Sequence, residues 1–189
     1  MKLGTTLTVF TRKEWRAWLK AHHDTEREIW LVYYKKSSGK SRIPYNDAVE
    51  EALCYGWIDS TLKPIDGEKY AQRFSPRRPG SNLSALNKER VRRLIRSRKM
   101  TRIGLARIEH TFREHKTEKK EHFTLPPDIR SALKQDPVVW KNYRAFPESY
   151  RRIRIGWIDG SRERQQVFDT RLRYFIRMTA KNKTFGMVK

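Results

Sequence analysis

The sequence predicts an α+β fold: an N-terminal unit with a small antiparallel sheet and helices, followed by an all-helical C-terminal part. Short runs of β-branched and aromatic residues, which are typical of strands, fall in the first 80 residues. Beyond them, apolar residues recur at helical spacing between proline and glycine breaks. Hydrophobic residues make up 37% of the 189 and aromatic residues 12%, which excludes disorder of the whole chain.

The N-terminal unit is predicted over residues 1–83, and its first helix over 12–22. Thr11 is the expected N-cap, because Glu14 follows three residues later in a capping-box pattern. Residues 28–35 are rich in β-branched and aromatic residues, which predicts the first strand.

A second helix and a hairpin complete this unit, over residues 46–55, 57–61 and 69–74. Asn46 is the expected helix cap, and Gly56 is expected to end the helix. The pair Asp66-Gly67 is typical of a hairpin turn. The three strands are expected to form an antiparallel sheet.

A basic helical connector is predicted over 84–122 and a helical C-terminal module over 123–189. Ser84 and Thr101 are expected at helix starts, and residues 114–121 form a charged loop or hinge. The predicted helices are 85–99, 102–114, 128–135, 137–145, 149–159 and 162–181. The string Gly-Trp-Ile-Asp occurs twice, in a predicted strand and in a predicted helix, so we interpret it as coincidence.

Positive charge is concentrated beyond residue 70. The net charge is +22, yet residues 1–70 hold 12 basic and 10 acidic side chains, whereas residues 71–189 hold 31 and 11. Such an excess attracts polyanions, namely nucleic acid, an acidic lipid surface or an acidic protein. The alternative is that the charge serves solubility and weak nonspecific adsorption only.

The basic loop at 73–81 is the preferred contact for phosphate, because it runs into the start of the helix that follows Ser84. The next helix is rich in arginine, and residues 151–154 add a second basic set. No known nucleic-acid motif is present. The predicted polyanion contacts are Arg77, Arg78, Lys88, Arg92, Arg93, Arg96, Arg151 and Arg152.

Polar residues around the central helix suggest a cleft for a small anionic or peptide ligand. The predicted cleft residues are Tyr45, Glu51, Asp59, Arg73, Ser84 and Asn87. The alternative, which we favour, is a structural network of ion pairs that holds the hairpin to the helix.

Nothing in the sequence predicts a metal, a cofactor or a catalytic residue. Cys54, the one cysteine, excludes an internal disulfide and is expected to be a buried, inert thiol at a helix C-terminus. The histidines lack metal-ligand spacing; they are His22, His23, His110, His115 and His122. No run is apolar enough for a transmembrane helix or a signal peptide, so a reducing cytoplasm is the expected compartment. The sequence does not specify an oligomeric state.

Several segments together resemble the YdeI/OmpD-associated, or bacteriocin-protection, family. They are residues 29–32 with 35–39, Tyr45, 48–59, Tyr70, 73–77, 81–91 and 126–152. The most specific is the string Glu-Glu-Ala-Leu-Cys-Tyr-Gly-Trp-Ile-Asp at 50–59. The resemblance implies bacterial or archaeal proteins linked to resistance against bacteriocins and cationic antimicrobial peptides, with no established reaction.

The favoured interpretation is a non-enzymatic binding protein of the bacteriocin-protection type, whose cationic part contacts a polyanion. A strongly cationic chain repels cationic peptides, so direct sequestration of such peptides is disfavoured for all but the N-terminal part. The alternative is a small hydrolase or transferase that uses a polar cleft around Glu51, Asp59 and Arg73.

Overall fold

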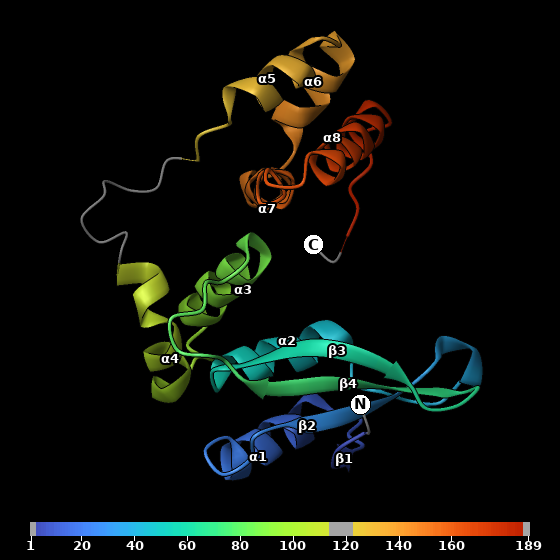
Figure 1. Cartoon of the computed structure of the whole chain (residues 1–189), viewed down its shortest axis with the longest axis vertical. Helices are drawn as coiled ribbons and strands as arrows, with labels where there is room; N and C mark the ends of the chain where they lie inside the picture. Colours follow the sequence, from blue (N-terminus) through green and yellow to red (C-terminus); the bar gives the residue numbers. More distant parts are fainter. Residues whose placement is uncertain (1–2, 114–122, 187–189) are drawn as a thin grey trace. The chain divides into compact units, whose positions relative to one another are not determined.

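The computed structural model describes residues 3–113 and 123–186, which form two compact units (Figure 1). Within these residues, the first unit holds 3–82 and 90–113, and the second holds 83–89 and 123–186. The predicted charged loop at 114–121 lies outside the described residues. The predicted α+β fold is confirmed, with a small sheet in the N-terminal part and mostly helices after it.

A four-stranded sheet is the centre of the first unit. Its strands are β1 (Thr6–Leu7), β2 (Ile29–Tyr34), β3 (Trp57–Pro64) and β4 (Lys69–Pro76), in the order β1-β2-β4-β3. The three predicted strands are present, and they pair antiparallel. The prediction missed β1, which pairs parallel with β2 at the edge of the sheet. Two residues are too few to show a two-residue alternation.

The β3–β4 hairpin turns at the predicted Asp66-Gly67 pair. The Asp66 carboxylate accepts hydrogen bonds from the backbone N–H groups of Glu68 and Lys69, both at 2.8 Å. Farther along, the register of β3 shifts between Asp59 and Leu62. This irregularity bends the outer strand of the sheet.

Helices α1 (Arg12–His22) and α2 (Tyr45–Cys54) pack beside each other, and a short 3₁₀ helix, η1 (Lys36–Ser38), precedes α2. The predicted capping box of α1 is present, with Thr11 at the N-cap. The predicted cap of α2 is wrong. Pro44 occupies that position without a side-chain hydrogen bond, and the Asn46 amide oxygen instead accepts a hydrogen bond from Arg90 at 2.6 Å.

Helices α3 (Ala85–Arg96) and α4 (Arg102–Arg113) follow the hairpin. The last turn predicted for α3 is absent, because Arg98 adopts the left-handed region with φ of 54°. The hydroxyl of Thr101 accepts a hydrogen bond from the Gly104 N–H at 3.0 Å and donates one to the Cys54 carbonyl. The start of α4 is thereby fixed against the end of α2.

Aromatic residues form the core between α1, α2 and the sheet. Trp15 and Trp57 are at most 1% exposed, and Trp15 meets Phe74 of β4 edge-on at 5.4 Å between ring centroids. The indole N–H of Trp15 donates to the Ala48 carbonyl at 2.9 Å, so its polar atom remains satisfied inside the core.

The second unit is helical, as predicted. Its helices are α5 (Pro127–Lys134), α6 (Pro137–Ala145), α7 (Glu148–Asp159) and α8 (Gln165–Ala180). Buried residues from all four form one core, which includes Ile129, Leu133, Val139, Tyr143, Ile158 and Phe175. The two Gly-Trp-Ile-Asp strings fold differently, since the first leads into β3 and the second ends α7.

Candidate functional site

Glu51 on α2 is buried and held by two arginines of α1. It is 2% exposed, and its carboxylate forms ion pairs with Arg12 and, at 2.5 Å, with Arg16. Arg12 and Arg16 are four residues apart, so they share one face of α1. Both are missing from the predicted cleft, although their spacing on a predicted helix was a usable signal.

The ion-pair network extends along α2. Arg12 also contacts Glu50 at 2.9 Å and Asp47 at 3.2 Å, and Arg93 of α3 forms an ion pair with Glu50. The acidic side chains of α2 are thus neutralised by neighbouring helices. These contacts favour the structural interpretation of Glu51 over a catalytic one.

Tyr45 and Asp59 are two predicted cleft residues whose side chains contact each other. The Tyr45 hydroxyl donates to the Asp59 carboxylate at 2.5 Å. Burial raises the pKa of Tyr45, and the hydrogen bond and negative charge of Asp59 raise it further. The phenol therefore stays protonated near neutral pH and acts as a donor, not as a base.

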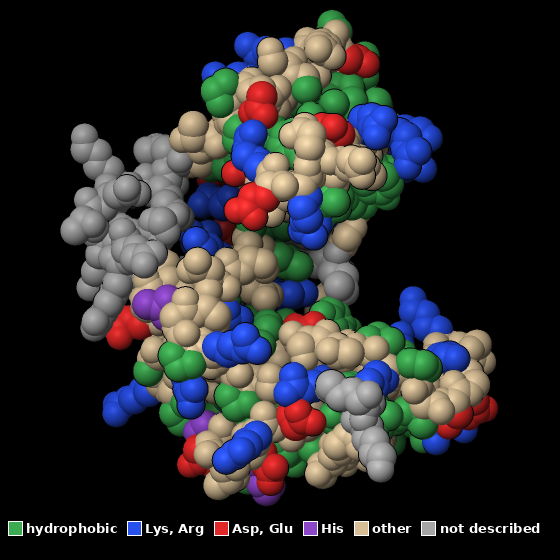
Figure 2. Space-filling model, in the orientation of Figure 1, with side chains coloured by type: hydrophobic (Ala, Val, Ile, Leu, Met, Phe, Trp, Pro, Cys, Tyr) green, Lys and Arg blue, Asp and Glu red, His purple; other side chains and the backbone are tan. Residues whose placement is uncertain are grey.

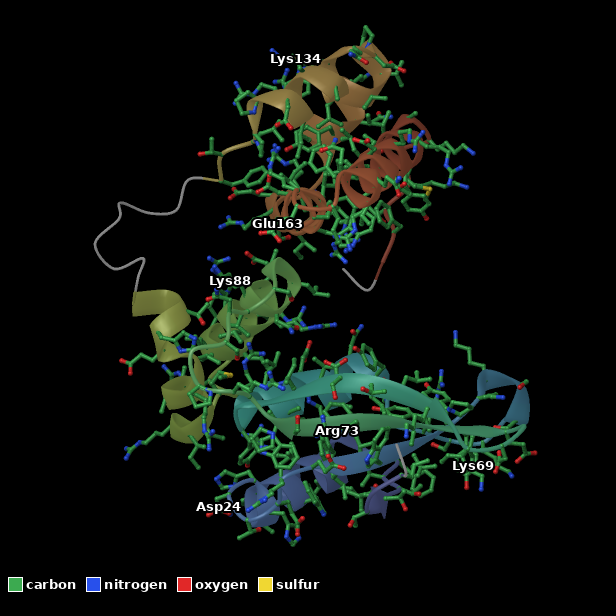
Figure 3. The ribbon with its side chains drawn as sticks, viewed as in Figure 1. Asp24, Lys69, Arg73, Lys88, Lys134 and Glu163 are labelled. Carbon is green, nitrogen blue, oxygen red and sulfur yellow. The ribbon has the colours of Figure 1, made fainter. Side chains whose placement is uncertain are left out.

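Arg73 lies on the opposite face of the sheet from Asp59. In the β2–β4 register Arg73 pairs with Trp30, whereas Asp59 pairs with Phe74, and successive strand residues point to opposite faces. The Arg73 guanidinium contacts Glu28 at 2.6 and 2.7 Å, and its hydrogen bond lowers the pKa of that carboxyl. Figure 3 labels Arg73 on the sheet.

Ser84 and Asn87 belong to the second unit. The Ser84 hydroxyl oxygen accepts a hydrogen bond from the Asn87 backbone N–H at 3.3 Å, which is the predicted cap at the start of α3. The six predicted cleft residues therefore occupy four separate environments: Tyr45 and Asp59 share one, Ser84 and Asn87 share another, and Glu51 and Arg73 each have their own.

Arg77 is unsuited to the polyanion contact predicted for it. It is 6% exposed, and its guanidinium donates to the carbonyl oxygens of Ser81 at 3.1 Å and Asn82 at 2.9 Å. The loop folds around this side chain, whereas Arg78 next to it is exposed. The local sequence did not show which of the two arginines would be buried. The carbonyl groups that surround Arg77 are brought together only by the folded path of the loop.

The remaining predicted polyanion contacts differ in how far they are neutralised. Arg93 forms an ion pair with Glu50, and Arg152 forms ion pairs with Glu148 and Glu89. Arg92 is half-buried and interacts with other side chains or the backbone. Arg78 and Arg96 are exposed and form no ion pair with a described residue, and Lys88 is half-buried on α3 (Figure 3). On the face drawn in Figure 2, Lys and Arg form separate groups with Asp and Glu among them.

Cys54 is a buried free thiol at the end of α2. Burial raises its pKa to about 11, and the nearby Glu51 carboxylate contributes to the rise. A thiolate nucleophile is therefore strongly disfavoured at neutral pH. Within residues 3–113 and 123–186, no three His, Cys, Asp or Glu side chains gather as metal ligands would. In the same part of the chain, every helix is too short or too polar to cross a bilayer.

Two family models match the chain, and each covers a different part of it. Residues 7–107, more than half of the chain, match the family described as Domain of unknown function (DUF8412). The chain belongs to the DUF8412 family. Residues 122–182 match the family described as Bacteriocin-protection, YdeI or OmpD-Associated (OmdA), which confirms the predicted resemblance there.

The segments on which the predicted resemblance was based fall within two different family matches. The string at 50–59 lies within the DUF8412 match, whereas the helices α5 to α8 lie within the OmdA match. The chain thus combines a DUF8412 domain with a YdeI/OmpD-associated domain. No curated protein and no solved structure matches it.

Proposed function

We propose that this DUF8412 member is a non-enzymatic, cytoplasmic protein of bacteriocin or antimicrobial-peptide tolerance that binds a polyanion through its basic side chains. The observation that carries the proposal is the excess of positive charge beyond residue 70, where the sequence has 31 basic and 11 acidic residues. The OmdA match supports the link to bacteriocin protection. The chain has one cysteine, the buried Cys54, and therefore does not depend on an internal disulfide, which is compatible with a reducing compartment.

Exposed arginines without ion pairs supply the binding groups. Arg78 and Arg96 in the first unit, and Arg164 and Arg173 in the second, are exposed and form no ion pair with a described residue. A guanidinium that is not neutralised locally can replace the counterions of a polyanion. Contacts of this kind bind the phosphate groups of a nucleic acid or an anionic surface, and they do not distinguish one base sequence from another.

The enzymatic alternative has weaker support. Its three named residues, Glu51, Asp59 and Arg73, are held by three different sets of partners. A general acid or base needs to reach a substrate, and Glu51 is enclosed by two guanidinium groups.

A salt titration tests the proposal with the intact protein. We expect double-stranded DNA, RNA or anionic vesicles to bind, with a logarithm of affinity that falls linearly with the logarithm of salt concentration. Replacing two of these exposed arginines, Arg78→Glu with Arg96→Glu, is expected to reduce that slope by about two. Elution from heparin at lower salt than the wild type is the parallel readout.

The control carries the same change of charge in the balanced part of the chain. Lys13→Glu with Lys20→Glu alters two exposed lysines of α1 and is expected to move the slope much less. Equal effects of the two pairs, or no binding at about 0.15 M salt, would refute the proposal and leave solubility as the role of the charge.

A further inference from the structure

A pocket in the second unit brings together cationic and aromatic side chains from α5, α6 and α7 with apolar side chains from the residues just before α5. It has a volume of about 310 Å³, within the size range of small-molecule sites. Its lining is half cationic and half apolar or aromatic: Arg130, Lys134, Arg144, Arg151, Phe123, Leu125, Trp140 and Tyr143. Figure 3 labels Lys134 at its position on α5.

The four cations of this pocket lack carboxylate partners in the part of the chain that the structure describes. None of them forms an ion pair with a described carboxylate, although neighbouring arginines do. Arg152 pairs with Glu148 at 2.5 Å, and Arg162 pairs with Asp128 at 3.0 Å. Some arginines of the unit are thus paired with carboxylates, whereas the four cations of the pocket gather around one cavity without a described carboxylate partner.

Aromatic rings hold two of these cations in place. The Lys134 ammonium lies 5.3 Å from the centre of the Trp140 ring, and the Arg151 guanidinium lies 5.6 Å from that of Tyr143. The two rings stack on each other at 5.6 Å. Positive groups positioned in this way lose little side-chain entropy when an anion binds.

Two buried donors in the pocket lining have no acceptor. Tyr143 is 2% exposed, and neither its hydroxyl nor the Nε of Arg151 has a hydrogen-bond partner among the described residues. Buried donors of this kind are costly, and an oxygen atom that reaches them recovers the lost interaction. Burial raises the pKa of Tyr143 to about 12, so its hydroxyl keeps its proton at neutral pH.

We infer that this pocket binds an organic phosphomonoester, with its phosphate held by Arg130, Lys134 and Arg151 and its apolar part against Phe123 and Leu125. A phosphomonoester carries nearly two negative charges and three acceptor oxygens, which suits several cations better than a single carboxylate does. The apolar half of the lining requires an organic group, which inorganic phosphate lacks. This site concerns a discrete small ligand and does not depend on polyanion binding.

Calorimetric titration of the full chain with phenyl phosphate tests the inference. At about 0.15 M salt, which screens diffuse attraction, we expect one site per chain. Inorganic phosphate and benzoate are expected to bind about tenfold more weakly, since one lacks the apolar part and the other the second charge. Adenosine 5′-monophosphate and a short-chain phosphatidate then identify the tighter source, nucleotide or lipid.

Three variants locate the site. Arg151→Gln and Arg130→Gln are each expected to weaken phenyl phosphate binding about tenfold, because each removes a charged donor to the phosphate. Tyr143→Phe is expected to weaken it several-fold, because it removes the unpartnered hydroxyl of the ring against which Arg151 lies. The matched control is Arg173→Gln, which removes one charge from an exposed arginine of α8 outside the pocket and is expected to leave the affinity within about twofold. Arg130 is exposed, so its variant remains informative even if Arg151→Gln fails to fold.

The inference is overturned if phenyl phosphate shows no saturable binding at about 10 mM. It is equally overturned if benzoate binds as tightly, or if Arg173→Gln loses as much affinity as Arg151→Gln. Failure of polyanion binding is a separate result. Arg151→Gln and Arg130→Gln each remove one of 43 basic groups and barely change elution from heparin, whereas Arg78→Glu with Arg96→Glu leaves the phenyl phosphate affinity unchanged.

Discussion

Glu51 owes its buried charge to two side chains of another helix. Its carboxylate is enclosed at 2% exposure, and Arg12 and Arg16 supply the opposite charge that makes such burial tolerable. The residue types in this network were visible in the sequence, and a structural ion-pair network was one of the two interpretations considered. The actual partners were not predicted, because they depend on how α1 packs on α2.

We predict that Glu51→Gln lowers the free energy of unfolding by about 3 kcal/mol, because it leaves two partly buried guanidinium groups with less compensation. Urea unfolding followed by tryptophan fluorescence measures this loss. Glu68→Gln is the control, since Glu68 and its partner Lys40 are both exposed and the expected cost is below about 1 kcal/mol. Equal costs in the two variants would show that burial of Glu51 is not decisive.

At the scale of elements, the crossing of α2 and α4 depends on a glycine. A Cβ atom added at Gly104 would lie 2.1 Å from the Cys54 carbonyl oxygen, a backbone atom that cannot swing aside. The helices themselves were predictable from periodicity and caps, and α1 and α5 to α8 lie close to the predicted ranges. The close approach of α2 and α4 was not predictable, because a glycine within a helical pattern does not show which other helix packs against it.

We expect Gly104→Ala to destabilise the protein by more than about 2 kcal/mol, although alanine normally favours a helix by about 1 kcal/mol. The reason is that α4 would have to move away from the end of α2. The comparison variant is Gly67→Ala in the hairpin turn, where an added Cβ meets no atom within 4 Å and stability is expected to stay nearly constant. A neutral or stabilising Gly104→Ala in the same unfolding assay would contradict this packing.

Across the whole molecule, the sequence predicted the fold class, the order of the α-helices and of the three longer strands, and the family match of the C-terminal part. Strand runs and helical periodicity are local signals, which explains that success. The predicted cleft required six residues to converge from distant segments, and strand alternation places Asp59 and Arg73 on opposite faces. The phosphomonoester pocket was largely missed because its cations come from three helices, and only Arg151 was named beforehand.

Both units are expected to lose stability in acid. The pKa of Glu28 in the first unit is lowered by its hydrogen bond to Arg73, and that of Asp128 in the second unit by its hydrogen bond to Arg162. Because each pKa is lower in the folded chain, the stabilisation is complete above the ordinary values of 4.5 and 3.8 and is lost as the pH falls through the folded values.

We therefore predict a constant urea midpoint between about pH 7 and 5.5 and a falling one below about pH 4.5. The double variant Glu28→Gln with Asp128→Asn lacks both titrating groups, so its midpoint is expected to fall less steeply. A wild-type midpoint that rises on acidification would contradict the assigned directions.

The two borders of the sheet have a consequence for self-association. One border, β1, offers two residues for pairing, and the other, β3, is interrupted between Asp59 and Leu62 and ends at a proline. A neighbouring copy therefore finds no long, regular row of free amide groups to extend. We expect concentrated solutions to resist the strand-by-strand growth that leads to fibres.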